Sequence, residues 1–215
     1  MEIALVLLLI LAAYLLGSIP SAVWVGRSLR GIDPREHGSR NAGATNTIRV
    51  LGTPLGVLVL LMDVAKGFFA VSLWHIGAGS FDSANALYTY MIALGLMAVV
   101  GHIYPVFAGF RGGKGVATIS GVLLALQPWA FLWLLLLFAL IVIVTRYISL
   151  GSVVCGLCYP FVLYFGFGER ALPFLIFASC TGLLLLYTHR KNIGRLLKGT
   201  ESKFQPTRHG SMGKG

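Results

Sequence analysis

Charge is what this chain has least of. Only 11% of its 215 residues are charged, whereas soluble globular domains carry about 25%. So few charged side chains cannot cover a water-facing surface, which excludes a soluble enzyme of ordinary type. Hydrophobic residues make up 57% of the chain and the mean hydropathy is +0.83. The composition therefore indicates a polytopic membrane protein.

Cysteine and clustered acidic residues are also scarce. The three cysteines are too few for a disulfide framework or a four-ligand zinc site. Cys155 and Cys158 share one face of a predicted helix, where we interpret them as packing residues. The seven acidic residues are scattered along the chain. We therefore expect no metal and no cofactor.

The chain contains seven apolar runs that are candidate membrane spans. They cover residues 3–26, 54–76, 84–108, 115–126, 129–145, 149–167 and 171–188. The fourth run is short: a twelve-residue helix rises only about 18 Å against a hydrocarbon core of about 30 Å. Its start is therefore expected to be recessed below the membrane surface. Residues 1–203 are predicted to form one membrane domain, followed by a disordered polar tail over residues 204–215.

The number of spans depends on the 31 uncharged residues between Lys114 and Arg146. One span here divides the basic residues equally between the two membrane faces. Two spans, separated by a turn at Gln127 and Pro128, place fifteen of the 17 basic residues on one face. The positive-inside rule favours the second arrangement. The prediction is an all-α protein with seven transmembrane helices, its N-terminus outside and its C-terminus in the cytosol.

The net charge is +10, and fourteen of the 17 basic residues lie in three polar segments. Residues 27–50, residues 109–115 and the chain from His189 onward all face the cytosol in the seven-span arrangement. Such a charge balance suits an anionic lipid or an anionic substrate. No nucleic-acid partner is expected.

A glycine-rich loop precedes the short fourth span, with the sequence RGGKGVAT over residues 111–118. Glycines let several backbone N–H groups converge, and the positive end of the following helix points to the same place. Lys114 adds a full positive charge. This pattern indicates phosphate binding, although the spacing is not that of a Walker A loop. A simple turn between two membrane helices is the alternative.

Two further segments carry groups that bind phosphate. The sequence GSRNAGATN over residues 38–46 offers hydroxyls and amides, and a short helix over residues 44–51 would place Thr45 and Arg49 on one face. After the last span, His189, Asn192 and Arg195 are spaced to face one pocket. The alternatives are an ordinary loop for the first segment and binding of anionic lipid headgroups for the second.

Ionisable residues also occur inside the predicted spans. Asp63 and Lys66 lie near the middle of the second span, where charged groups are costly. Their spacing lets them pair, and we interpret them as a structural pair in the membrane rather than as catalytic residues. His102, near the cytosolic end of the third span, is either a packed histidine or a functional one. The small residues of the Gly17–Ser21 segment predict close contact between helices.

Taken together, these motifs resemble the bacterial acyl-phosphate:glycerol-3-phosphate acyltransferases. The resemblance covers about residues 4–203 and rests on GSIP (17–20), GSRNAGATN (38–46), DxxKG (63–67), GH (101–102), PVFAGFRGGKGVAT (105–118) and HRKNIGRLLKGTE (189–201). It implies transfer of a fatty acyl group from acyl phosphate to the sn-1 hydroxyl of glycerol 3-phosphate, the first step of phospholipid synthesis. It also implies a multi-pass protein of the bacterial inner membrane, in contact with membrane lipids, with a cytosolic active site and functional coupling to an enzyme that forms acyl phosphate.

The resemblance assigns roles to individual residues. The implied catalytic residues are Lys114, Ser39, Arg49, His189 and Asn192. The implied phosphate-binding residues are Asn41, Thr45, Asn46, Gly112, Gly113 and Gly115. Arg40 departs from the glycine that many relatives hold after the serine. The general base is either a substrate phosphate oxygen or His189, whose imidazole titrates near neutral pH.

A small membrane transporter or flippase for phosphorylated metabolites is the alternative function, because it would need a similar cationic cavity. The absence of repeat symmetry and the confinement of polar motifs to one face argue against it. A CDP-alcohol phosphotransferase would need clustered aspartates for metal ions. No histidine is followed five residues later by aspartate, so the HxxxxD arrangement of acyltransferases that use coenzyme A or carrier-protein thioesters is absent.

Overall fold

The computed structural model describes residues 2–205, and this part of the chain is helical, without strands. The helices are α1 (Glu2–Gly17), α2 (Ser21–Arg30), η1 (Pro34–Glu36), α3 (Ala44–Leu51), α4 (Thr53–Ser72), α5 (Trp74–Gly77), η2 (Ala78–Ser80), α6 (Ala84–Ile103), η3 (Val106–Ala108), α7 (Val116–Leu126), α8 (Pro128–Thr145), α9 (Ile148–Phe161), η4 (Val162–Gly166), α10 (Leu172–Thr188) and α11 (Arg190–Leu197).

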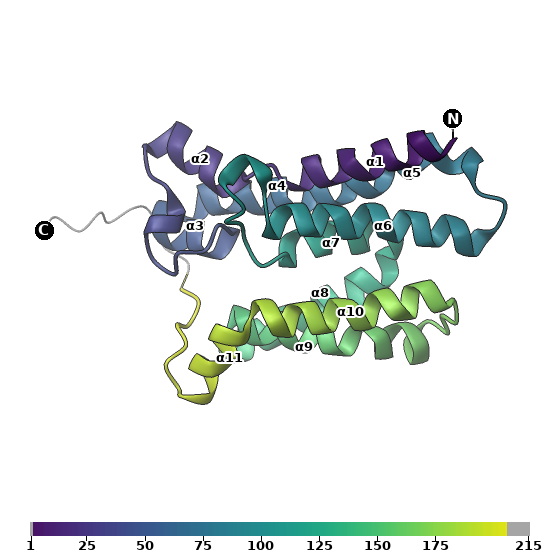
Figure 1. Cartoon of the computed structure of the whole chain (residues 1–215). Helices are drawn as coiled ribbons and strands as arrows, with labels where there is room; N and C mark the ends of the chain where they lie inside the picture. Colours follow the sequence, from purple (N-terminus) through teal and green to yellow (C-terminus); the bar gives the residue numbers. More distant parts are fainter. Residues whose placement is uncertain (1, 206–215) are drawn as a thin grey trace, which may run out of the picture.

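The long helices run side by side in two groups (Figure 1). In one group α1, α4, α6 and α7 pack together, and in the other α8 and α10 pack on α9. One apolar core joins both groups, because α6 also contacts α10 and α7 contacts α8. The polar helices α2, α3 and α11 lie at the end of the molecule opposite the N-terminus (Figure 1).

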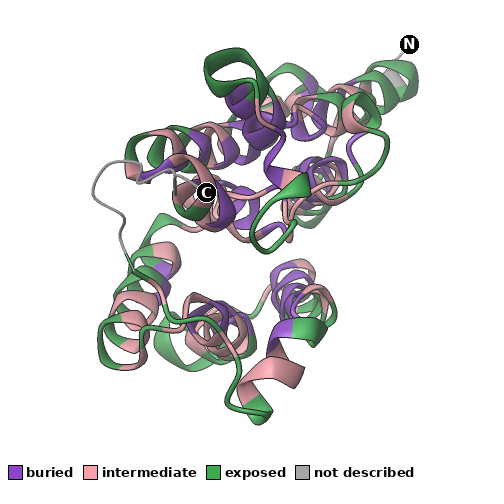
Figure 2. Cartoon of the chain, turned by 90° about the vertical axis from the view of Figure 1, so that its left-hand side faces the viewer, coloured by how far each residue is buried: buried purple, intermediate pink, exposed green. Residues whose placement is uncertain are grey.

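The distribution of buried residues fits a lipid environment. Viewed from the polar end, buried residues lie mainly on the faces that the helices turn toward one another (Figure 2). Large apolar side chains of α8, such as Trp133 and Ile143, are exposed on the outside. A soluble protein rarely exposes apolar side chains so densely, whereas lipid-facing helices do. The structure therefore agrees with an integral membrane protein.

Each predicted apolar run corresponds to a helix or to a helix pair. Within residues 2–205, four helical segments are long and apolar enough to cross a membrane, and the number rises to six if each of two bent pairs, α1 with α2 and α10 with α11, is one span. The short run predicted at residues 115–126 is α7, with 11 residues. A separate helix, α8, begins at Pro128. The predicted turn at Gln127 and Pro128 is therefore confirmed.

The first run is not the single straight helix that its composition suggests. It bends by 42° between α1 and α2, where Pro20 lacks the N–H group that would continue the helical hydrogen bonds. The small residues predicted to allow close helix contact do so: a Cβ atom on Gly17 would overlap the backbone of Ala98 in α6. The last span bends by 63° at His189, which lies between α10 and α11.

The predicted domain boundary at residue 203 lies close to the end of the described part of the chain. The predicted tail covers residues 204–215, and residues 206–215 lie outside the described part of the chain. The N–H group of Phe204 donates a hydrogen bond to the carbonyl oxygen of Arg146 at 2.7 Å. The chain is thus held against the start of α9 beyond the predicted end of the domain at residue 203.

Candidate active site

The three polar segments predicted from the sequence meet at one pocket of about 280 Å³ at the polar end of the molecule. Its lining comes from the loop before α3, the end of α6, the glycine-rich loop before α7, and the junction of α10 with α11. The lining residues are Ser39, Arg40, Asn41, Ile103, Tyr104, Gly113, Lys114, Tyr187, Thr188, Arg190, Lys191, Asn192 and Arg195. Five predicted site residues are thus brought together with four further cations.

Lys114 lies at the centre of a chain of polar contacts that joins the two helix groups. Its Nζ donates to Asn192 Oδ1 at 2.5 Å, and Asn192 Nδ2 donates to Glu201 Oε1 at 2.6 Å. Ser149 Oγ donates to the same Glu201 oxygen at 2.7 Å, and Arg195 Nε donates to Glu201 Oε2 at 2.6 Å. The contact of the glycine-rich loop with α11, together with the contacts that Glu201 makes with α9 and α11, therefore fixes the position of the ammonium group.

The environment of Lys114 makes its ammonium group easier to deprotonate than usual. Burial lowers the pKa of Lys114 to about 8, while Glu201 raises it and the charges of Arg195 and Arg49 lower it further. The pKa of Glu201 itself is lowered, because hydrogen bonds from Asn192, Ser149 and Arg195 outweigh the effect of burial. This region holds an excess of positive charge, so a bound dianion would be strongly favoured.

His189 is buried, with 3% of its surface exposed. Its Nδ1 lies 3.0 Å from the carbonyl oxygen of Leu185 and 3.3 Å from Thr188 Oγ1. When Nδ1 carries the proton and donates it to Leu185, Nε2 is left as an acceptor. This tautomer suits a base, although His189 does not itself line the pocket; its neighbours Thr188 and Arg190 do.

The glycine-rich loop is built differently from a phosphate-binding loop. The N–H group of Gly113 donates to His102 O, and that of Gly112 donates to Ile103 O, each at 3.1 Å. These N–H groups are therefore occupied by α6 and do not point at a phosphate. The expected role of Gly112 and Gly113 as amide donors is corrected: their lack of a side chain lets the loop pack on α6. Gly115 has a φ of +89° at the N-cap of α7, a conformation that favours glycine.

The first polar segment is organised from within by Asn46. The side-chain amide donates to the carbonyl oxygens of Pro34 at 2.7 Å, Asn41 at 3.0 Å and His37 at 3.1 Å, and its oxygen accepts from Ser39 N at 2.8 Å. Asn46 is only 1% exposed, so its predicted phosphate contact is replaced by a role in holding Ser39 and Asn41 at the pocket.

The predicted helix over residues 44–51 is confirmed as α3. It carries the half-buried Thr45 and the exposed Arg49, neither of which lines the pocket. Arg49 nevertheless lies near enough for its charge to lower the pKa of Lys114. Arg40 lines the pocket with a φ of +57°, a left-handed conformation that is uncommon outside glycine.

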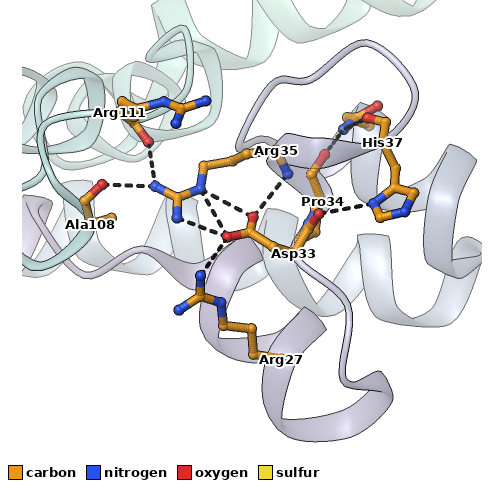
Figure 3. A network of polar contacts seen from close by, with 8 residues as sticks. Arg27, Asp33, Pro34, Arg35, His37, Ala108 and Arg111 are labelled. Carbon is orange, nitrogen blue, oxygen red and sulfur yellow. Dashed lines mark hydrogen bonds and ion pairs between the residues drawn. The ribbon is translucent and has the colours of Figure 1, made fainter.

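A second ionic network holds the first polar segment against the loop that follows α6 (Figure 3). Asp33 accepts hydrogen bonds from Arg35 at 2.8 Å and from Arg27 at 3.0 Å, and Arg35 also donates to the carbonyl oxygen of Ala108 at 2.7 Å. The hydrogen bonds from Arg35 lower the pKa of Asp33 to about 2. Arg35 is therefore used to join two loops.

The pairing predicted for Asp63 and Lys66 is confirmed, with Lys66 Nζ at 2.8 Å from Asp63 Oδ1. Both residues are buried within α4. The cysteines agree with the packing interpretation, because Cys155 and Cys158 pack against the apolar core and no disulfide occurs within residues 2–205.

Sequence reasoning missed the residues that support the site from behind. Glu201 ends one of the strings that carry the family resemblance but was given no role, and Ser149 looked like an ordinary residue of a span. Asp33 and Arg35 were counted only as charges. Each acts through a contact with a residue that is distant in the chain or in another element, which a single sequence does not reveal.

Comparison with known proteins identifies relatives along almost the whole chain. The sequence model of a family described as glycerol-3-phosphate acyltransferase matches residues 7–199. A glycerol-3-phosphate acyltransferase from Fusobacterium nucleatum subsp. nucleatum is 42% identical over 196 residues, covering 91% of this chain and 96% of the relative. A protein called glycerol-3-phosphate acyltransferase 2 from Moorella thermoacetica is 46% identical over 198 residues, covering 92% and 96%.

Solved structures agree with these sequence matches. The crystal structure of PlsY (YgiH), an integral membrane glycerol 3-phosphate acyltransferase, in its glycerol 3-phosphate form has a TM-score of 0.81 and 40% identity, covering 93% of this chain and 96% of that one. The lysophosphatidic acid form has a TM-score of 0.79 and 39% identity, covering 94% and 96%.

Proposed function

Because this chain belongs to the glycerol-3-phosphate acyltransferase family, we propose that it takes the acyl group from acyl phosphate and transfers it to the sn-1 hydroxyl of glycerol 3-phosphate. The hydroxyl oxygen attacks the acyl carbon, the bond from that carbon to the phosphate oxygen breaks, and inorganic phosphate leaves. The hydroxyl proton passes to a phosphate oxygen or to His189. The products are lysophosphatidic acid and phosphate.

The placement of Lys114 carries this proposal. Its ammonium group lies in a pocket with Arg40, Arg190, Lys191 and Arg195, so two phosphate groups can be held there without strong mutual repulsion. A positively charged donor that is fixed before the reaction stabilises charge developing on the leaving phosphate. The apolar wall formed by Ile103 and the two tyrosines of the pocket suits the start of an acyl chain that enters from the lipid.

The remaining roles follow from position. Asn192 orients Lys114 through their 2.5 Å contact, and Ser39 and Asn41 offer further polar groups in the lining of the pocket. Arg49 adds positive charge near Lys114. The proposed base is His189 or a substrate phosphate oxygen, and no residue in an HxxxxD arrangement is available for the role.

A pH profile tests whether the charge on Lys114 is needed. The pKa of Lys114 is lowered to about 8, so the ammonium form is present below this pH and is lost above it. Glycerol 3-phosphate remains a dianion throughout this range, because its second pKa is about 6. We expect kcat/KM to fall as the pH rises through about 8. In Lys114→Arg, whose guanidinium stays charged, this fall should disappear; a wild-type profile that is flat from about pH 7 to 10 would count against the role of Lys114.

We also propose that the seven spans place the site on the cytosolic face of the bacterial inner membrane. Contact between Lys114 and Asn192 requires the glycine-rich loop and α11 to share a face. Gln127 Nε2 lies 3.5 Å from Glu169 Oε2, which fits a common opposite face for both turns. Since fifteen of the 17 basic residues then fall on one face, the positive-inside rule makes that face cytosolic.

Cysteine labelling tests this topology. In a background with Cys155, Cys158 and Cys180 replaced, single cysteines at the exposed positions Arg30, Arg111 and Lys198 should all resist a membrane-impermeant thiol reagent applied from outside. A cysteine at the exposed Asp82, between the second and third spans, should react and serves as the matched control. Labelling of the Lys198 position from outside, with protection at the other two, would support six spans instead.

A further inference from the structure

A buried ionic cluster lies next to the glycine-rich loop, and none of its residues lines the pocket. It consists of Ser21, Asp63, Lys66 and His102, all at most 6% exposed. Asp63 Oδ1 accepts hydrogen bonds from Lys66 Nζ at 2.8 Å and from Ser21 Oγ at 2.9 Å, and it lies 3.6 Å from His102 Nδ1. Lys66 Nζ also donates to the carbonyl oxygen of Ile19, at the bend between α1 and α2. The cluster thus joins α2, α4 and α6.

Structural bracing accounts for only part of this cluster. Lys66 already balances the charge of Asp63, and its hydrogen bond to Ile19 joins the second span to the first. Nothing in that arrangement requires a third ionisable side chain, and such groups are costly inside a membrane. The edge of the His102 ring that carries Nε2 contacts a different part of the protein.

Nε2 of His102 faces the main chain of Gly113. A Cβ atom placed on Gly113 would overlap His102 Nε2 and would lie 3.1 Å from the carbonyl oxygen of Ala42. The main chain of Gly113 is therefore packed closely against the imidazole ring, with the first polar segment nearby. Lys114 is the next residue, so the ring sets how far this part of the loop can move.

We propose that His102 is a positioning residue of the acyltransferase: Asp63 holds its ring, and the ring holds the glycine-rich loop so that Lys114 Nζ stays in the pocket. This inference rests on the proposed role of Lys114. A displacement of about 1 Å at a reacting group can lower the rate about 100-fold, so a small shift of the loop has a large effect. His102 touches neither substrate in this account and acts only through Gly113.

The test is a pair of double-mutant cycles. His102→Asn keeps an amide donor near the Nδ1 position facing Asp63 and removes the Nε2 edge. It should lower kcat/KM at least tenfold while the unfolding midpoint falls by only a few degrees. Gly113→Ala should be strongly impaired alone, because its methyl group meets the ring. The double variant, which also carries His102→Asn, should have a kcat/KM at least threefold higher than Gly113→Ala alone, since the ring atoms that the methyl group would overlap are gone.

Gly112→Ala is the matched control. A Cβ atom there would overlap the backbone oxygen of His102 rather than its ring, so His102→Asn should give no recovery. His102→Gln, whose amide reaches the Nε2 position, should also leave Gly113→Ala impaired. His102→Ala provides the same comparison if the asparagine variant does not fold.

Two results would overturn the inference: wild-type kinetics for His102→Asn, or equal impairment by Gly113→Ala with and without the His102 substitution. The same cycles can also be measured by the unfolding midpoints of the variants. These midpoints report the contact between His102 and Gly113 without any substrate. If acyl transfer by the wild-type protein fails, the proposed function fails. If the wild-type protein is active but the effects of the substitutions at His102 and Gly113 are additive, only the role of His102 is rejected.

Discussion

Lys114→Met should insert and fold normally but lose acyl-transfer activity by about 100-fold or more, as expected when a donor to a charge developing in the transition state is removed. Methionine keeps the length of the side chain and removes its charge. A charge-assisted contact to phosphate contributes about 1.5–3 kcal/mol, and more where charge grows during the reaction. Glu201 keeps its hydrogen bond from Arg195 at 2.6 Å in this variant, so the supporting network is not left with an unpaired carboxylate.

Two further variants separate charge from shape. Lys114→Arg keeps the charge in a planar, bulkier group and should recover only part of the activity. Arg170→Met is the matched control, because Arg170 lies beside Tyr164 and Glu169 at a turn that the seven-span topology places on the opposite face. It should be nearly silent. Retention of more than about a third of wild-type turnover by folded Lys114→Met, far more than a lost transition-state contact allows, would mean that the loop is only a turn.

The second large effect concerns the acyl donor. With palmitoyl phosphate as donor the purified protein should turn over glycerol 3-phosphate, whereas palmitoyl thioesters of coenzyme A or acyl carrier protein should support at least about 100-fold slower transfer. The cationic pocket stabilises a departing phosphate, and a departing thiolate offers no such set of oxygens. Loss of the contacts made by several cations corresponds to more than the roughly 2.7 kcal/mol that a 100-fold change requires.

The donor comparison needs a control for contaminating enzymes. Protein carrying Lys114→Met, purified in parallel, gives the background for each donor. Comparable rates with a thioester and with acyl phosphate, both abolished by the same substitution, would contradict the proposed donor specificity.

The membrane helices could be predicted from the sequence because their signals are local. Apolar runs of sufficient length, the proline after Gln127 and the distribution of basic residues located α4 to α10 within a few residues. The bend at Pro20 was within reach of the same reasoning, because proline cannot donate the required hydrogen bond. Gly17 indicated that the first span packs closely against another helix. The sequence did not show that its partner would be Ala98 in α6.

The site could be predicted only as far as residue chemistry allowed. Lys114 and Asn192 were expected in one pocket, and they are in contact. The glycines were expected to bind phosphate through their N–H groups, yet α6 occupies these donors at Gly112 and Gly113. Likewise Asn46 looks like a substrate ligand in sequence and serves as a support for the loop. Which polar group faces inward depends on contacts between elements that no local pattern encodes.

Acyl transfer from acyl phosphate is tested most directly by product stoichiometry. Purified protein in lipid nanodiscs is given palmitoyl phosphate and glycerol 3-phosphate, and inorganic phosphate and lysophosphatidic acid are quantified in the same samples. We expect the two products to appear in a one-to-one ratio, and we expect Lys114→Met to form lysophosphatidic acid at least about 100-fold more slowly. Phosphate without lysophosphatidic acid would indicate hydrolysis. No reaction at all, together with movement of glycerol 3-phosphate across proteoliposome membranes, would indicate a transporter. Either result would contradict the assigned acyltransferase chemistry.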